Sequence, residues 1–139
     1  MPVYQFSPFA IPPAVSAALV MLLAIGILLT RFSRTSVAMF ILAVAAAAWQ
    51  TACAFLFSAV EERTALMWAT AGFVSLAFVA PAAYQFVVSI LPGASHRRIV
   101  SAAGWLVAAQ FGMVMLTTGY FMSGVRRFWW GFHPTYDTA

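Results

Sequence analysis

Four long apolar stretches, separated by three short polar breaks, dominate the sequence. They predict helices over residues 12–30, 35–60, 64–91 and 99–123. A helix of about 20 residues crosses a hydrocarbon core of about 30 Å, so each stretch is long enough to span a membrane. Because lipid cannot hydrogen-bond an open backbone, helices are the expected form. Breaks this short join antiparallel neighbours, which predicts an all-α integral membrane fold with four transmembrane helices in an up-down bundle.

The domain organisation follows from the same pattern. Residues 1–123 form a single transmembrane domain, and residues 124–139 form a tail. The tail is rich in aromatic residues but too short and too polar to cross again, so we expect it to lie along the membrane interface. The residues before the first helix contain no basic run and no A-x-A site, which indicates a retained helix rather than a cleaved signal.

Composition strengthens the membrane interpretation. Hydrophobic residues make up 64% of the chain and charged residues only 7%, whereas a soluble domain carries about a quarter charged residues. The net charge is +4, and every basic residue is an arginine at the end of an apolar run. That placement is typical of topology determinants and not of a phosphate-tracking stripe, so we expect no nucleic-acid partner.

The arginines also predict an orientation. The first and third breaks contain no acid and hold Arg31, Arg34, Arg97 and Arg98. The second break and the tail hold three arginines together with the acids Glu61, Glu62 and Asp137. The positive-inside rule therefore places the first and third breaks in the cytoplasm and both termini outside. We expect a multi-pass protein of the bacterial cytoplasmic (inner) membrane with periplasmic termini.

Three glutamines lie inside the predicted spans: Gln50, Gln85 and Gln110. At 1.5 Å per residue, Gln50 lies roughly 15 Å and Gln110 roughly 20 Å below the outer ends of their helices, depths that are close enough for the two to pair across a helix interface. One interpretation of the three glutamines is that they line a polar path or a ligand pocket. The favoured one is hydrogen bonding between helices, worth about 0.6 to 2 kcal/mol each.

Small residues recur at helical spacing on two of the helices and predict close backbone packing. These candidate packing residues are Gly104, Ala108 and Gly112 on the fourth helix, and Ala43, Ala47 and Thr51 on the second. Such stripes serve internal packing and association with a partner equally well.

Residues that usually carry chemistry are missing from the spans. No Asp, Glu, Arg or His lies deep within any of them, although proton-coupled transport needs an embedded ionisable group. No metal-ligand set, axial histidine or catalytic triad can be assembled, and Cys53 is alone. We expect no enzyme activity, no cofactor and no soluble substrate. A lipid or pigment held by stacking would leave no motif.

The tail carries the candidate interfacial and partner-facing residues. They are Arg126, Arg127, Trp129, Trp130, His133 and Tyr136. Aromatic and cationic side chains of this kind anchor a segment at the boundary between lipid and water, and they also suit contact with another protein.

Several motifs resemble one known family. They are FSPFAIPP before the first helix, FSAVEERTALMWA around the second break, PAAYQF in the third helix, Trp105, and the closing SGVRRFWWGFHPTY. Together they resemble the first four helices of the seven-transmembrane input region of bacterial sensor histidine kinases. The resemblance implies the topology and an input or assembly role. The kinase domains of that family are not in these 139 residues, so we expect no kinase activity from them.

Three functions are consistent with these observations. The favoured one is an accessory or structural subunit within a larger membrane complex, for example a photosynthetic, respiratory or signalling assembly. The alternative is a sensory input module or a fragment of a sensor kinase, and the third is a transporter or channel subunit. The expected partners are membrane lipids and other integral membrane proteins.

Overall fold

A computed structural model describes residues 3–91, 96–118 and 124–135, with His96 and Arg97 described by their backbone only. Its helices are η1 (Pro8–Ala10), a short 3-10 turn, followed by α1 (Ile11–Thr30), α2 (Arg34–Ser58), α3 (Glu62–Ile90) and α4 (His96–Thr118). Two strands follow, β1 (Gly124–Phe128) and β2 (Gly131–Thr135). The predicted set of four long helices is confirmed, and each is long and apolar enough to cross a membrane.

The helix limits differ slightly from the predicted ones for local reasons. The side chain of Ser33 accepts a hydrogen bond from the Ser36 N–H at 3.1 Å, so α2 starts at Arg34. The same helix stops at Ser58 because the backbone of Ala59 is extended, and the free Ser58 carbonyl then accepts a hydrogen bond from the Gln5 N–H at 2.8 Å. The predicted continuation of the last helix over residues 119–123 lies outside the described residues.

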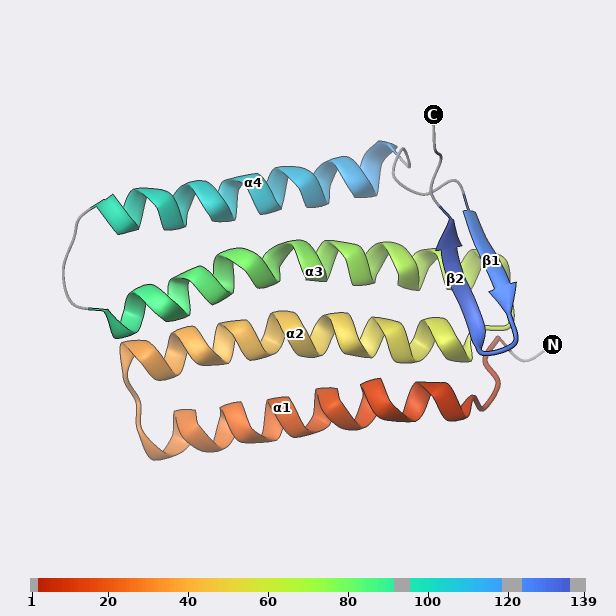
Figure 1. Cartoon of the computed structure of the whole chain (residues 1–139), viewed down its shortest axis with the longest axis horizontal. Helices are drawn as coiled ribbons and strands as arrows, with labels where there is room; N and C mark the ends of the chain where they lie inside the picture. Colours follow the sequence, from red (N-terminus) through yellow and green to blue (C-terminus); the bar gives the residue numbers. More distant parts are fainter. Residues whose placement is uncertain (1–2, 92–95, 119–123, 136–139) are drawn as a thin grey trace.

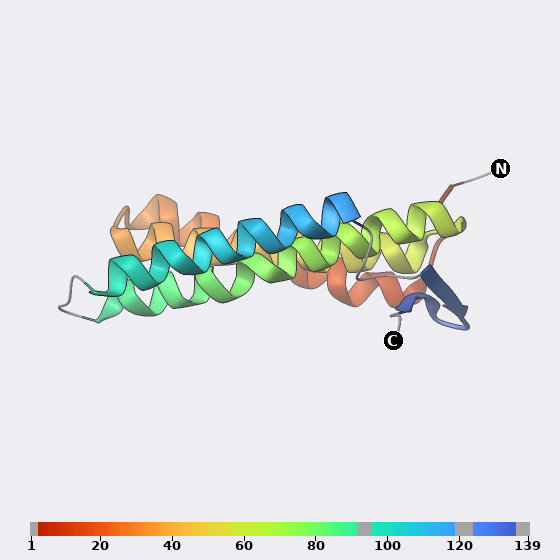
Figure 2. The same ribbon diagram turned by 90° about the horizontal axis from the view of Figure 1, so that it is seen from above.

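The four helices stand side by side in chain order (Figure 1). Helix contacts connect α1 to α2, α2 to α3 and α3 to α4. Figure 2 shows the same row from above, with the four helices along the long dimension and the strands at one end. The helices alternate in direction as predicted, but they form an open row and not a bundle closed around a central core. Among the four long helices as described, each outer one, α1 or α4, therefore packs extensively on a single neighbour.

Small side chains make up the interfaces within this row. Most of the buried apolar residues are alanines, among them Ala24, Ala52 and Ala82. A Cβ added to Gly72 of α3 would lie 3.4 Å from the Ala52 Cβ of α2, which is ordinary contact distance. Small residues let two helix backbones approach closely, and dispersion contacts then hold the helices together in lipid.

The tail is a β-hairpin, so the prediction of an all-α fold is wrong for this segment. β1 and β2 pair antiparallel, with Val125 opposite Pro134 and Phe128 opposite Gly131. Two tryptophans, Trp129 and Trp130, form the loop between the strands. A hairpin this short is marginal in isolation. It forms here because one of its faces packs against the ends of α2 and α3.

Candidate functional site

The predicted pairing of Gln50 with Gln110 is wrong. Gln50 lies on α2 and Gln110 on α4, and α3 packs between these two helices. The side-chain oxygen of Gln50 is buried without a hydrogen-bond partner in the described part of the chain. Gln110 is exposed on α4. Similar depth in the membrane suggested a pair, but adjacency in the row decides which residues meet.

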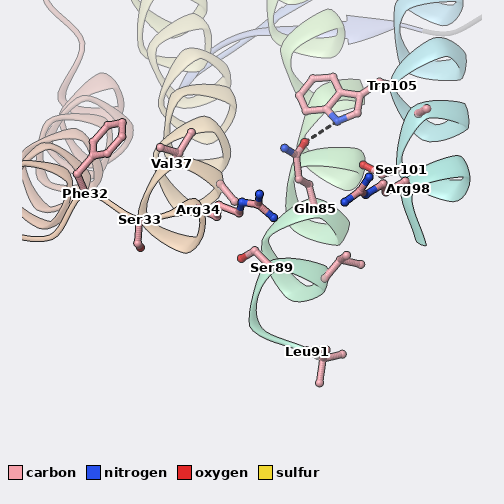
Figure 3. Close-up of a pocket in the computed structure, with 13 residues that line it drawn as sticks. Phe32, Ser33, Arg34, Val37, Gln85, Ser89, Leu91, Arg98, Ser101 and Trp105 are labelled. Carbon is pink, nitrogen blue, oxygen red and sulfur yellow. Dashed lines mark hydrogen bonds between the residues drawn. The ribbon is translucent and has the colours of Figure 1, made fainter. Parts of the chain in front are cut away.

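Gln85 does bridge two helices. Its Oε1 accepts a hydrogen bond from the Trp105 Nε1–H of α4 at 2.8 Å (Figure 3). The sequence singled out Gln85 as an embedded polar residue but not its partner. The available signal was that both residues lie a short distance from the third break, on antiparallel helices that the break joins.

The small-residue stripes lie within the row. On α4, a Cβ added to Gly104 would be 3.4 Å from Pro81 of α3, and one added to Gly112 would be 3.4 Å from Val74. Ala108, between them, is buried. On α2, Ala43 and Ala47 are buried as well. Ala47 and Thr51 line a cavity of about 510 Å³ together with residues of α1. These stripes therefore do not form an exposed contact surface.

Three segments that are distant in the sequence meet at one end of the row, which we call the hairpin end. They are the N-terminal residues 3–10, the α2–α3 turn and the β-hairpin (Figure 1). Phe132 of β2 joins a buried cluster with Leu56, Ala59, Ala65 and Ala69. Alternate residues of β2 are buried, so the strand has one face on the helix ends and one face outward.

Aromatic side chains hold the N-terminal residues 3–10 against the helices and the hairpin at the hairpin end. The hydroxyl of Tyr4 accepts a hydrogen bond from the Trp68 Nε1–H at 2.9 Å. The Phe55 ring stacks on Trp68 with centroids 4.5 Å apart. Phe9 meets the hairpin loop edge-on, with its ring centroid 5.2 Å from that of Trp129.

The outward face of the hairpin carries most of the predicted partner-facing residues. The guanidinium of Arg126 lies 5.8 Å from the centre of the Phe128 ring, and Trp130 stacks on that ring at 4.8 Å. His133 approaches Phe128 edge-on at 6.1 Å. Trp129 is 80% exposed.

Two of the predicted tail residues differ from this pattern. Arg127 lies over the ring of Phe132 at 5.7 Å, beside the buried cluster. Tyr136 lies outside the described residues. The outward face is thus a cation–aromatic surface.

Within the described ranges no group of three His, Cys, Asp or Glu side chains could hold a metal ion. Comparisons of the chain with family models, curated proteins and solved structures found no match. The resemblance to sensor-kinase input regions therefore stays a prediction.

Proposed function

We propose that the chain is a non-catalytic integral membrane subunit that packs against other integral membrane proteins in a larger complex. Four apolar spans support its membrane insertion. The open row supports a packing role, because α4 has a face that no other described helix covers. The observation that carries the proposal is the position of Gln110 on that face.

Gln110 lies within the apolar span of α4 and is exposed. Leu106, Met113 and Thr117, at helical spacing from it, share its face, and Leu106 is 71% exposed. Its carboxamide makes no side-chain hydrogen bond to another described residue. A polar group without a partner in hydrocarbon costs several kcal/mol. A transmembrane helix of another protein, carrying a hydrogen-bonding side chain, would remove that cost and is the occupant we infer.

The hairpin offers a second candidate contact surface, at the hairpin end of the row. Its outward face, with Arg126, Phe128 and Trp129, resembles in composition the aromatic and arginine-rich centres of protein interfaces. We place the protein in a bacterial cytoplasmic membrane, with the hairpin end outside. The arginine bias of the other end supports this orientation.

The test is photocrosslinking in the native membrane. A photoreactive amino acid at position 110 or 106 should give a discrete protein adduct. The matched control is position 23 on α1, where Leu23 is 65% exposed on the other outer helix and should face lipid. Adducts to lipid alone at positions 110 and 106 would contradict the proposal. An adduct with a second copy of the chain would contradict binding of another protein and would show that this face self-associates.

A substitution tests the hydrogen bond itself. Gln110→Leu should reduce recovery of the partner in mild detergent by about fivefold or more, because it removes a hydrogen bond between helices worth about 1 kcal/mol or more. The control is Gln50→Leu, the same change at a residue whose side-chain oxygen is buried within the row. Equal effects of the two substitutions would argue against a role for Gln110 in binding.

A further inference from the structure

A large cavity lies at the end of the row opposite the hairpin. We call this end the arginine end, since Arg31, Arg34 and Arg98 lie there. Helices α2 and α4 both pack on α3. Residues of all three helices line a cavity of about 1250 Å³ at the arginine end (Figure 3).

Two arginines face each other across this cavity. Arg34 projects from α2 and Arg98 from α4, and their guanidinium groups point toward the space over α3 near Gln85 (Figure 3). None of the described residues that line the cavity is acidic. The acids that the structure describes, Glu61 and Glu62, are at the hairpin end. Neither guanidinium makes a hydrogen bond or an ion pair with another described residue.

The backbone adds to this positive charge. Arg34 and Arg98 lie in the first turns of α2 and α4. A helix N-terminus carries a partial positive charge, so an arginine there is unfavourable unless an anion compensates it. Two such helix ends, each with an arginine, meet at one cavity, which makes this end strongly attractive to an anion.

The walls of the cavity show what kind of anion fits. Away from the arginines the lining includes the apolar side chains of Val37 and Val88 and the ring of Trp105, together with the polar side chains of Gln85 and three serines. A small inorganic anion would use the arginines but leave these walls and most of the volume uncovered. An amphiphile with an anionic head and a hydrocarbon chain matches both parts.

We propose that this cavity binds an anionic phospholipid. The phosphate group lies between Arg34 and Arg98, whose planar guanidinium groups can each donate two hydrogen bonds to its oxygens. An acyl chain lies against the apolar part of the cavity wall, over α3 and between α2 and α4. The inference rests on the membrane insertion proposed above and is independent of the partner, because the Gln110 face of α4 is separate from the cavity lining.

Native mass spectrometry of the purified protein in detergent tests this site. Titration with phosphatidylglycerol should give a complex with one bound lipid, and phosphatidylcholine should bind at least tenfold more weakly. Arg34→Gln and Arg98→Gln should each weaken phosphatidylglycerol binding about tenfold or more, because each removes charge-assisted hydrogen bonds. Arg126→Gln, which removes the same charge at the hairpin end, is the matched control and should leave the affinity unchanged.

Three results would overturn the proposal. Equal binding of phosphatidylcholine would show that the headgroup charge is not recognised. An equal effect of Arg126→Gln would show that net charge alone attracts the lipid. Displacement of the lipid by millimolar inorganic phosphate would assign the site to a free anion.

Folding and charge are checked separately. Circular dichroism of each variant verifies the helices, and Arg34→Lys with Arg98→Lys should keep more of the affinity than the glutamine variants. If the lysine variants lose as much binding as the glutamine variants with unchanged helicity, phosphate recognition by these two charges is wrong. A normal crosslink at position 110 in the same preparation would leave the partner proposal standing.

Discussion

The two ends of the helix row are built in contrasting ways. At the hairpin end, three segments distant in sequence are joined by backbone hydrogen bonds, ring contacts and the buried Phe132. At the arginine end, the helices are linked by isolated polar contacts. These include the Trp105–Gln85 hydrogen bond and one at 3.3 Å from the Thr35 hydroxyl to the Ser89 carbonyl. A cavity separates α2 from α4 there.

The contrast shows how one helical scaffold can have a closed end and an open end. Aromatic side chains attract each other and exclude water, so the hairpin end closes on itself. Arginines of like charge repel each other, which opposes closure of the arginine end. We expect the hairpin end to be the more stable part, since local stability follows buried apolar contact.

The largest effect should come from removing the side chain at the centre of the closed end. Phe132→Ala should lower the free energy of unfolding by about 3 kcal/mol, because Phe132 is only 7% exposed and its loss leaves a cavity under the hairpin. Thermal unfolding in detergent, followed by tryptophan fluorescence, measures the loss. Phe128→Ala on the outward face is the control and should cost much less; similar losses would mean that the hairpin is not packed as described.

A smaller effect is expected from the turn that brings the hairpin against α2. Gly131 has a φ of 137°, and a Cβ at this position would lie 3.1 Å from the Phe57 Cα. Gly131→Ala should therefore cost about 1 to 3 kcal/mol. Gly26→Ala on α1 is the matched control, because a Cβ there meets nothing within 4 Å. The melting temperatures of the two variants measure the difference. An unchanged melting temperature for Gly131→Ala would contradict the described turn conformation and its close approach to Phe57.

The smallest effect should come from the arginine end. Trp105→Phe keeps an aromatic side chain, although a smaller one, and removes the hydrogen bond to Gln85, so it should cost about 0.6 to 2 kcal/mol. A double-mutant cycle with Gln85→Leu should show coupling, whereas Gln50→Leu and Gln110→Leu should be additive because these residues do not meet. Additive losses of stability for the Gln85 and Trp105 variants would contradict a hydrogen bond between α3 and α4 at these residues.

The helices could be predicted because each span is decided locally. The apolar stretches and the arginines that end them specify both the number of helices and their alternation. The partners of the embedded glutamines could not be predicted in the same way. The depth of a residue along its helix can be read from the sequence. Which helix Gln50 or Gln110 faces, however, depends on how the helices are arranged around one another.

The hairpin was missed for a related reason. A five-residue strand containing Pro134 is a weak strand signal, because proline removes a backbone donor. The Trp129–Trp130 loop also lacks the usual turn residues of a tight hairpin. The roles of Phe132 and Gly131 depend on the tertiary structure, because Phe132 packs at the α2–α3 turn and Gly131 lies close to Phe57.

The sequence by itself thus determined the four apolar helices, their alternation and the separation of arginines from acids, since these depend on composition and chain order. Tertiary structure alone decided that the row stays open, that the tail folds back as a hairpin, and that Arg34 and Arg98 share one cavity. These features depend on contacts between segments far apart in the chain, and no local pattern encodes which of those segments meet.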